Sequence, residues 1–510
     1  MGEYFQSHSF IKSLEITAIT GLLGSFFAVS LGTYFARRFA LFQWRLKRTQ
    51  RLLLLLPYLI PNFVLAIAYV LTWNPTTGLL NAWLPLPFSL YGMSGMILLF
   101  GIVHLPVAFL MLENKFERLD SSLREAAVLS GANTFELIWK IELPLLKPTL
   151  LSAFGLCFAL NISAFAIPAW IGAPEKVYPL TYKIYQSVSL GGATGLSQAA
   201  WISLVLFFLA VPSLILNALT QRNEKRYITL SGKSSRKNEL ELSGSSFIFF
   251  QIIFVMSQAV FWVIPLTTLF VSTLVKPGCL QQAGLSCLRD ASLHSYSYVL
   301  FELSETRDAL KGSLLYGGAS ALLILVLCVL TLILFSKSPR LLRTVEWIFG
   351  IPVVTPGAII AIGLIVLFSG SSWLNLYNTP WIVVLAYILK HFNLAFQSIR
   401  TGYMNLSQSL IEAARISGAS TLKIWIKIIL PILKSDCLGS FFLVLIPILG
   451  ELTMSVFLTS PSFRSIGTVL FDLQDYSDQA SAGALSILLI LMILTLNQTA
   501  RALSRGKLGY

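Results

Sequence analysis

Apolar windows of about 20 residues recur along this chain, and they restrict its fold more than any other feature. A helix of that length crosses a hydrocarbon core of roughly 30 Å. Eleven windows qualify: residues 14–36, 52–72, 93–113, 149–171, 198–219, 247–274, 313–335, 345–369, 380–399, 436–458 and 480–498. The runs are continuously apolar and lack the polar–apolar alternation of barrel strands. We therefore predict an all-α polytopic membrane protein with about 11 transmembrane helices.

The distribution of charge agrees with this prediction and orients the chain. Of the 510 residues only 12% are charged, too few to cover several soluble domains. The net charge of +14 is not a nucleic-acid face, because Lys and Arg gather in loops at 37–51, 222–237, 337–343 and 501–507, whereas 73–92 and 370–379 carry none. This is the positive-inside pattern. We expect a multi-pass protein with the basic loops and the C-terminus in the cytoplasm and the N-terminus outside.

A segment of the chain occurs twice. Leu119–Lys147 aligns without a gap with Leu406–Lys434 at an offset of 287, and sixteen of the twenty-nine pairs are identical. A slightly different offset matches Pro57, Pro61 and Ala66 with Pro352, Pro356 and Ala361. Six predicted spans separate each element from its copy, and an even number preserves orientation, so the halves are parallel repeats. We predict a first repeat of about five spans at 1–221, a hydrophilic cytoplasmic linker at 222–244, and a second repeat of about six spans at 245–510.

Each copy of the repeated segment is typical of two short helices joined by a glycine hinge. In the first copy Gly131 tolerates a left-handed backbone, and Asn133 or Thr134 caps the following helix. Pro144 is expected to end that helix, so that the chain turns back into the membrane. The second copy repeats these features with Gly418, Ser420 or Thr421, and Pro431. The apolar residues at helical spacing indicate a docking surface, and a helix lying on the membrane surface is the alternative.

The same segment resembles the signature of permease subunits of binding-protein-dependent ABC importers. The shared features are Glu-Ala-Ala, a Gly six residues after the Glu, and Leu-Pro twelve and thirteen residues after that Gly. In that family the segment forms a coupling helix that docks into a groove of the cytoplasmic ATPase. Carried onto this chain, the resemblance implies these coupling residues: Glu125, Ala126, Gly131, Leu143, Pro144, Glu412, Ala413, Gly418, Leu430 and Pro431.

The resemblance also implies the surroundings of the chain. It predicts two fused permease domains in a bacterial cytoplasmic (inner) membrane, an ABC ATPase, most simply a homodimer, and an extracytoplasmic substrate-binding protein. Leu-Ser-Gly-Lys-Ser-Ser at 230–235 is not a phosphate loop, because its first Gly would fall at Tyr227. We expect a transport subunit that is not an enzyme and needs no cofactor, with ATP hydrolysis on the partner chain. An ion-coupled secondary transporter would favour inverted repeats, and a membrane scaffold would not need two docking helices.

Two further stretches bear on the cargo. Ile162–Gln186, with Phe-x-x-Pro-Ala-x-x-Gly, and Gly450–Leu473 resemble the corresponding segments of ferric-iron-type permeases, although Ala164 stands where that family often has Asp. The resemblance favours ferric iron and leaves thiamine, polyamines and sulfate-like anions as alternatives.

Few residues are candidates for the pathway. Glu451 lies in a predicted span, where an ionised carboxylate costs several kcal/mol unless it faces water, a partner or a pathway. Its oxygens suit a hard trivalent ion, and a hydrogen bond to a neighbouring helix is the alternative. His104 and His391 are paired by the repeat, and helix-to-helix hydrogen bonds are favoured over metal handling. Cys279 and Cys287 share an extracytoplasmic loop, where a disulfide is possible, but the sequence does not show that the sulfurs meet.

Overall fold

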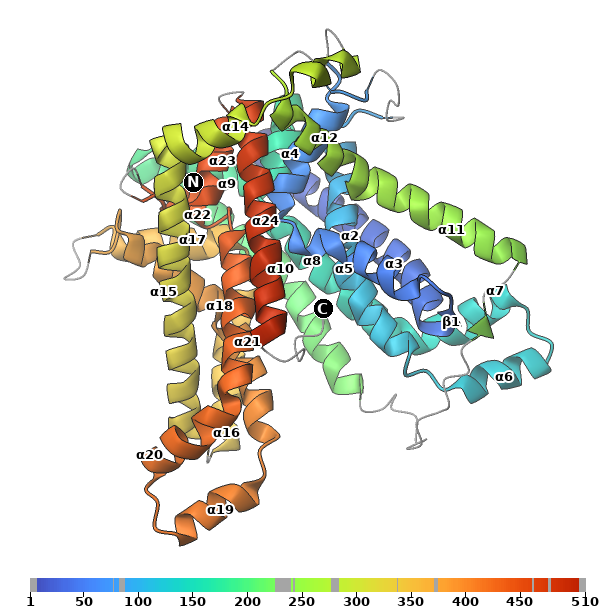
Figure 1. Cartoon of the computed structure of the whole chain (residues 1–510), viewed down its shortest axis with the longest axis vertical. Coiled ribbons are helices and arrows are strands. Elements are labelled where there is room, and N and C mark those ends of the chain that lie inside the picture. Colours follow the sequence, from blue (N-terminus) through green and yellow to red (C-terminus); the bar gives the residue numbers. More distant parts are fainter. Residues whose placement is uncertain are drawn as a thin grey trace. The chain divides into compact units, whose positions relative to one another are not determined.

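The computed structural model is almost entirely helical (Figure 1), and it describes residues 7–76, 78–81, 88–224, 240–241, 244–276, 284–336, 338–370, 375–460, 463–475 and 478–503. Within these ranges, nine helices are long and apolar enough to cross a membrane: His8–Leu41 (α2), Met93–Phe116 (α5), Thr134–Ser163, Gly192–Ser213, Gly244–Leu274, Ser304–Phe335 (α15), Pro380–Met404 (α18), Thr421–Leu449 and Gln479–Leu503 (α24). Two bent helix pairs raise the count to eleven, as the apolar windows predict.

Proline produces the two bends. Lys47–Leu59 (α3) meets Asn62–Trp73 (α4) at 98°, and Pro339–Val354 (α16) meets Gly357–Phe368 (α17) at 106°. Pro61 and Pro356 are the N-cap residues of α4 and α17, and each of the preceding helices contains a further proline. Proline lacks the N–H that would continue a helix and collides with the preceding turn. These are prolines that the repeat pairs, so both halves bend at the same place.

The remaining elements are the parts of the composite spans and the short connections between spans. They are the helices Ser121–Leu129 (α6), Thr134–Glu136 (α7), Leu143–Ser163 (α8), Leu180–Ser189 (α9), Gly192–Glu224 (α10), Gly244–Gln258 (α11), Ile264–Leu274 (α12), His294–Ser297 (α14), Gln408–Ile416 (α19), Thr421–Ile424 (α20), Leu430–Leu449 (α21), Ser455–Leu458 (α22) and Ile466–Asp475 (α23). The π-helical turns Leu137–Glu142 (η1), Pro168–Gly172 (η2), Ala259–Val263 (η4), Tyr298–Glu302 (η6) and Trp425–Ile429 (η7), and the 3₁₀ turns Ala173–Glu175 (η3) and Gly284–Asp290 (η5), lie between them. Phe42–Gln43 (β1) and Leu240–Glu241 (β2) form a two-residue parallel pair.

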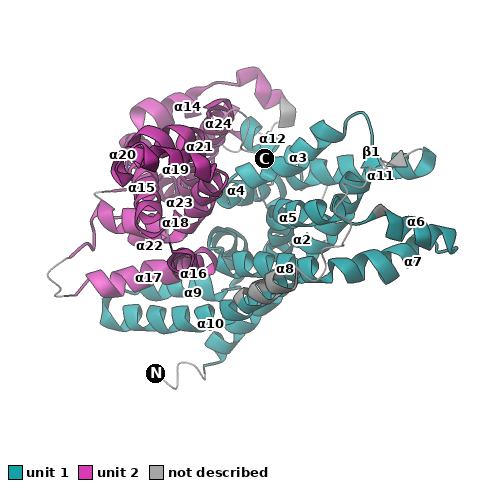
Figure 2. Ribbon diagram, turned by 90° about the horizontal axis from the view of Figure 1, so that it is seen from below, with its two compact units in different colours: residues 1–271, 278–284 teal, residues 272–277, 285–510 magenta. Residues whose placement is uncertain are grey.

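Two compact units divide the chain, residues 1–271 with 278–284, and residues 272–277 with 285–510 (Figure 2). In unit 1, α2 packs closely on α5 because small residues line the contact. A Cβ atom at Gly32 would lie 2.9 Å from the Cβ of Ala108. In unit 2, Gly317 of α15 faces Ile448 of α21 in the same way, at 3.2 Å. Glycine therefore brings helix backbones together in both units.

The helix that follows the linker packs in the first unit. The side chain of Gln50 donates to Gln251 (2.6 Å), the hydroxyl of Tyr69 donates to the carbonyl of Val260 (3.1 Å), and Phe254 joins the aromatic core of α2 and α5. Most of the span Gly244–Leu274 is thus part of unit 1. The predicted repeat boundaries, which begin the second repeat at residue 245, remain a prediction about sequence, and most of the linker 222–244 lies outside the described residues.

Candidate coupling segments and pathway residues

The first coupling helix, α6, has defined ends. The carboxylate of Asp120 accepts a hydrogen bond from the backbone N–H of Ser122 (3.0 Å), and this contact lowers the pKa of Asp120 below its usual range. At the other end Gly131 has φ of +84°, and its N–H donates to the carbonyl of Val128 (2.9 Å) while the N–H of Ala132 donates to Ala127 (3.0 Å). This pair of bonds is the Schellman ending, which requires a left-handed residue.

The second coupling helix, α19, ends in the same way. Gly418 has φ of +77°, its N–H donates to Arg415 (2.9 Å), and the N–H of Ala419 donates to Ala414 (3.0 Å). A Cβ atom built on Gly131 or Gly418 meets nothing within 4 Å. Backbone conformation alone, and not lack of space, therefore calls for glycine at both hinges.

The helix after each hinge is capped and then continues into the membrane. Asn133 caps α7 in a capping box with Glu136, and Ser420 caps α20. The expectation that Pro144 and Pro431 end these helices is wrong. Each proline lies in the first turn of a long helix, directly after a π-helical turn, and the helices run unbroken over Thr134–Ser163 and Thr421–Leu449.

The π-helical turn explains why proline is tolerated there. The N–H of Leu143 donates to the carbonyl of Ile138, five residues back instead of four. Such a turn is wider than an α-helical one, so the proline ring that follows has room beside the preceding carbonyl, and its missing N–H falls where the hydrogen-bond pattern already changes.

Both segments expose apolar side chains at the same positions. Leu129 and Ile416, which the repeat pairs, are each 88% exposed. The next two matched pairs behave alike: Phe135 and Leu422 are 68% and 62% exposed, and Trp139 and Ile426 are 59% and 55% exposed. The signature residues Glu125, Ala126, Glu412 and Ala413 are also exposed. Exposed apolar surface of this kind is typical of an interaction site. The coupling role of these residues stays a prediction.

The two histidines have different surroundings. Nδ1 of His104 lies 2.6 Å from Oδ1 of Asn161, whose amide nitrogen donates to the carbonyl of Gly21 (3.2 Å) and the hydroxyl of Ser25 (2.9 Å). This network joins α5, α8 and α2 by hydrogen bonds between helices. The repeat places Ile448 where the first half has Asn161, and Nε2 of His391 has no hydrogen-bond partner among the described residues.

Glu451 follows α21 and caps the short helix α22. Its carboxylate accepts hydrogen bonds from the backbone N–H of Met454 (2.8 Å) and from the N–H (3.1 Å) and hydroxyl (3.2 Å) of Ser455. These bonds give the side chain a structural role and stabilise its negative charge. A pathway role for Glu451 remains a prediction.

A charged residue that the sequence analysis missed lies close to this region. Nζ of Lys390, on α18, donates to the carbonyls of Val353 (3.0 Å) and Thr355 (2.6 Å), where α16 ends at its bend. A cation suits the carbonyl end of a helix. Its position next to His391 within an apolar window was the available signal, because ionisable residues inside membrane spans are expensive and commonly functional.

The described cysteines are one disulfide-bonded and three free residues. Cys287 is buried and disulfide-bonded, and its predicted partner Cys279 lies outside the described residues. Cys157, Cys328 and Cys437 are free. Among the described residues, no group of three or more His, Cys, Asp or Glu side chains is arranged to hold a metal ion.

One protein family and several known proteins are similar to this chain. The family model described as "Binding-protein-dependent transport system inner membrane component" matches residues 28–229 and 324–506. The chain is 24% identical over 467 residues to "Putative ferric transport system permease protein FbpB 1" of Haemophilus influenzae, covering 89% of this chain and 72% of the relative. It is 25% identical over 473 residues to "Fe(3+)-transport system permease protein FbpB 2" of the same organism, covering 91% and 84%. A shorter match, 27% identical over 190 residues, covers 37% of this chain and 71% of "Putative 2-aminoethylphosphonate transport system permease protein PhnV" of Salmonella paratyphi A.

Proposed function

The chain belongs to the family of binding-protein-dependent transport system inner membrane components, whose model matches both of its halves, and from that premise we propose that it imports ferric iron. It is a multi-pass membrane permease subunit, as its apolar helices and its family require. ATP is hydrolysed on a separate ABC ATPase, and the cargo arrives from an extracytoplasmic binding protein.

The duplicated coupling segment is the observation that best supports transport driven by ATP. Two copies with the same glycine hinge and the same exposed apolar positions provide two equivalent docking helices, α6 and α19. Two equivalent helices suit two equivalent ATPase subunits, so the ATPase is a homodimer. A short helix held by each subunit moves with it as a rigid body and transmits nucleotide-driven closure to the membrane helices.

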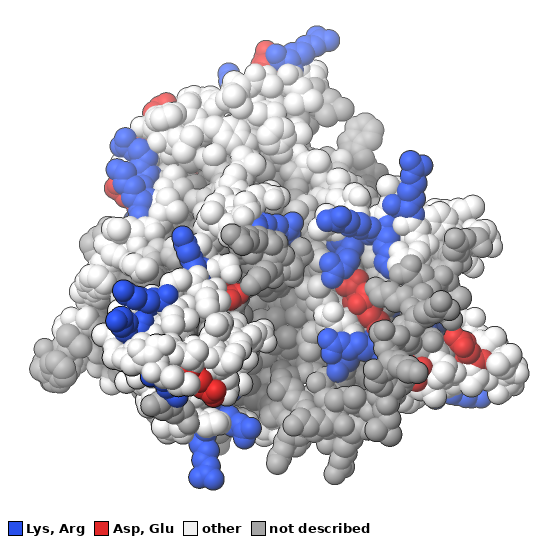
Figure 3. Space-filling model, turned by 60° about the horizontal axis from the view of Figure 1, so that its bottom comes forward, with Lys and Arg blue, Asp and Glu red and all other residues white. Residues whose placement is uncertain are grey.

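The orientation follows from the charge distribution. Along the sequence, Lys and Arg gather in the loops at 37–51, 222–237, 337–343 and 501–507, and the face drawn in Figure 3 shows Lys and Arg in several clusters and fewer Asp and Glu. Basic clusters mark the cytoplasmic side. The N-terminus therefore lies outside and the C-terminus inside, in the bacterial cytoplasmic membrane. The repeats comprise residues 1–221 and 245–510.

Ferric iron is the cargo because relatives named for ferric transport match about nine-tenths of the chain. The relative named for 2-aminoethylphosphonate matches 37% of it. Binding proteins supply most of the chemical discrimination in such systems, so the pathway needs only weak sites that release the ion. The single carboxylate of Glu451 meets that requirement, since hard oxygen ligands suit a trivalent ion.

Uptake in cells tests the choice of cargo. The chain is expressed with an ABC ATPase and an extracytoplasmic binding protein from its source organism, in a host without its own ferric importer. Saturable accumulation of radiolabelled ferric iron is expected, and no accumulation of thiamine, spermidine or sulfate above the vector control. Accumulation of one of those three, with none of iron, would overturn the cargo assignment while leaving the importer class intact.

A further inference from the structure

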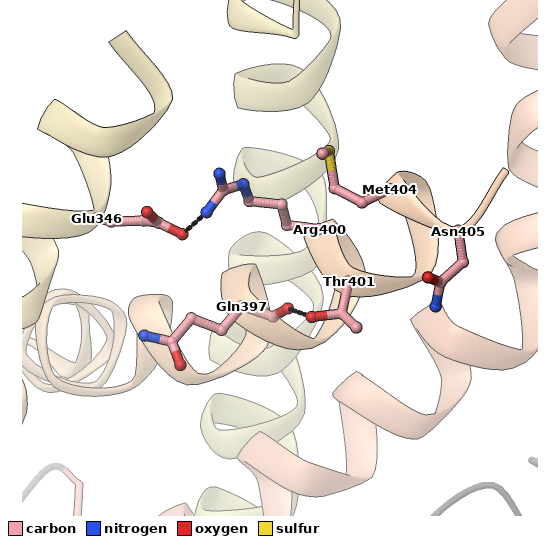
Figure 4. A pocket seen from close by; sticks show the side chains of 6 residues that line it. All are labelled: Glu346, Gln397, Arg400, Thr401, Met404 and Asn405. Carbon is pink, nitrogen blue, oxygen red and sulfur yellow. Dashed lines mark hydrogen bonds and ion pairs between the residues drawn. The ribbon is translucent and has the colours of Figure 1, made fainter. Parts of the chain in front are cut away.

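In each unit, an ion pair joins the first helix of the bent pair to the last turns of the helix that precedes the coupling helix. In unit 1, Nε of Arg51 on α3 donates to both carboxylate oxygens of Glu113 on α5 (2.9 Å each), and Nη2 lies 2.8 Å from Oε2. In unit 2, Arg400 on α18 pairs through Nη1 with Glu346 on α16 (Figure 4). We call α3 and α16 the arms, and the last turns of α5 and α18 the stems.

The repeat makes these two pairs equivalent. The offset of 287 that aligns the coupling segments carries Glu113 onto Arg400. The offset of 295 that aligns the prolines of the two bends carries Arg51 onto Glu346. The same two helix positions are therefore paired in each half, but the arm is basic and the stem acidic in the first half, whereas the second half has the opposite arrangement.

The pairs lie directly before the coupling helices. Glu113 is three residues from the end of α5 at Phe116, and α6 begins at Ser121. Arg400 is four residues from the end of α18 at Met404, and α19 begins at Gln408. On the other side, each arm runs from the ion pair to its bend. Each pair thus fixes the segment that would transmit movement of the coupling helix to a bent membrane helix.

Because the Glu113 side chain is buried, a change of charge at either residue of the first ion pair is costly. The side chain of Glu113 is 4% exposed, so its carboxylate depends on Arg51 for a partner. The second pair borders a pocket of about 340 Å³, lined by Glu346, Gln397, Arg400, Thr401, Met404 and Asn405 (Figure 4). That space gives a longer side chain at position 346 room to adjust.

We propose that the two ion pairs are clamps that position the coupling helices, and that the exchanged charges make each arm specific for the stem of its own half. The arm of one half placed against the stem of the other would bring Arg51 to Arg400, or Glu346 to Glu113, and like charges repel. A duplicated chain needs such discrimination, because its matched helices otherwise present similar surfaces. Arg51, Glu113, Glu346 and Arg400 are positioning residues, and the inference rests on the proposed coupling role of α6 and α19.

Charge reversal in the full chain, read by three measurements, tests the clamp. The single variants Arg51→Glu and Glu113→Arg should insert normally, bind the ATPase, and lose roughly tenfold in iron transported per ATP hydrolysed, since each faces like charges across a buried contact. The double variant Arg51→Glu/Glu113→Arg restores the pair and should recover most of that loss. If it is as uncoupled as the single variants, the clamp is refuted.

The role of the exchanged charges is tested by reversing both pairs. The double variant gives both halves the same polarity, whereas adding Glu346→Arg/Arg400→Glu makes them opposite again. The fourfold variant should therefore couple better than the double variant, and equal coupling by the two would refute the discrimination. If the single reversals fail to insert, the variant Arg51→Gln/Glu113→Gln takes their place. It should insert but transport less iron per ATP hydrolysed. Wild-type coupling by this variant would refute the clamp.

Thermal unfolding of the purified chain in detergent separates this inference from the proposed function, because it needs neither ATP nor cargo. The single reversals should lower Tm and the double reversal should restore it. Absence of ATP-driven iron uptake by the wild-type chain, with this Tm pattern intact, would refute the function and not the pairing.

Discussion

Substitution of the two hinge glycines tests the coupling segments most selectively. Gly131 and Gly418 have φ of +84° and +77°, and a Cβ atom at either position meets nothing within 4 Å. The Cβ atom of a valine there meets no neighbour, so the cost that we expect is the backbone strain. A left-handed conformation costs an L-residue about 1–2 kcal/mol, and a β-branched side chain lies at the upper end of that range. Since about 1.4 kcal/mol corresponds to tenfold in an equilibrium, each change lowers the population of the hinged geometry by roughly tenfold.

The assay compares ATP-dependent iron uptake with membrane insertion and with co-purification of the ATPase. Gly131→Val/Gly418→Val should insert normally, because both hinges are exposed and lie outside the membrane helices, yet lose most uptake and ATPase binding. Gly131→Asn/Gly418→Asn is the matched control, since Asn tolerates the left-handed region and should retain most activity. Gly318→Ala in α15 is a second control, with open space and helical backbone. Wild-type uptake by the valine variant, or equal losses with Asn and Val, would refute the role of the hinge.

Three other predictions concern single features. Glu451→Gln retains an oxygen that accepts the N–H of Met454 but removes the charge, so ferric uptake should slow several-fold with ATPase binding unchanged; wild-type uptake would leave helix capping as its only role. Lys390→Met removes the donor to the carbonyls of Val353 and Thr355 and should destabilise the purified chain by about 1–3 kcal/mol, measured as a fall in Tm; an unchanged Tm would contradict this. A reporter fused after residue 5 should be active only outside the cytoplasm and one at residue 230 only inside, and the reverse pattern would overturn the orientation.

Hydropathy predicted which segments form membrane helices, but not where such a segment bends. The windows 52–72 and 345–369 predict spans, yet both are bent by about a right angle. Mean hydropathy does not depend on where a window turns. Pro61 and Pro356, each preceded by another proline four residues earlier, were the local signal for a break. The repeat strengthens that signal, because the same spacing occurs at matched positions in both halves.

Local capping chemistry was predicted more closely than the continuation of the helices. The sequence predicts hinges at Gly131 and Gly418. It leaves two capping residues open in each copy, and in the structure the caps are Asn133 and Ser420. Pro144 was misread because a π-helical turn lets the helix continue past it, and no simple sequence pattern predicts such a turn. The ion pairs were missed because their partners lie 62 and 54 residues apart on different helices, and the sequence does not show which helices pack together.

The central claim is that this chain is the membrane half of an ATP-driven importer, and transport by purified components tests it most directly. The chain is reconstituted in proteoliposomes with its ATPase, oriented so that the binding protein loaded with ferric iron meets the extracytoplasmic face. Addition of ATP to the ATPase side should drive accumulation of iron against its gradient, and a non-hydrolysable ATP analogue should not. Accumulation driven by a proton or sodium gradient in the absence of ATP would contradict the account.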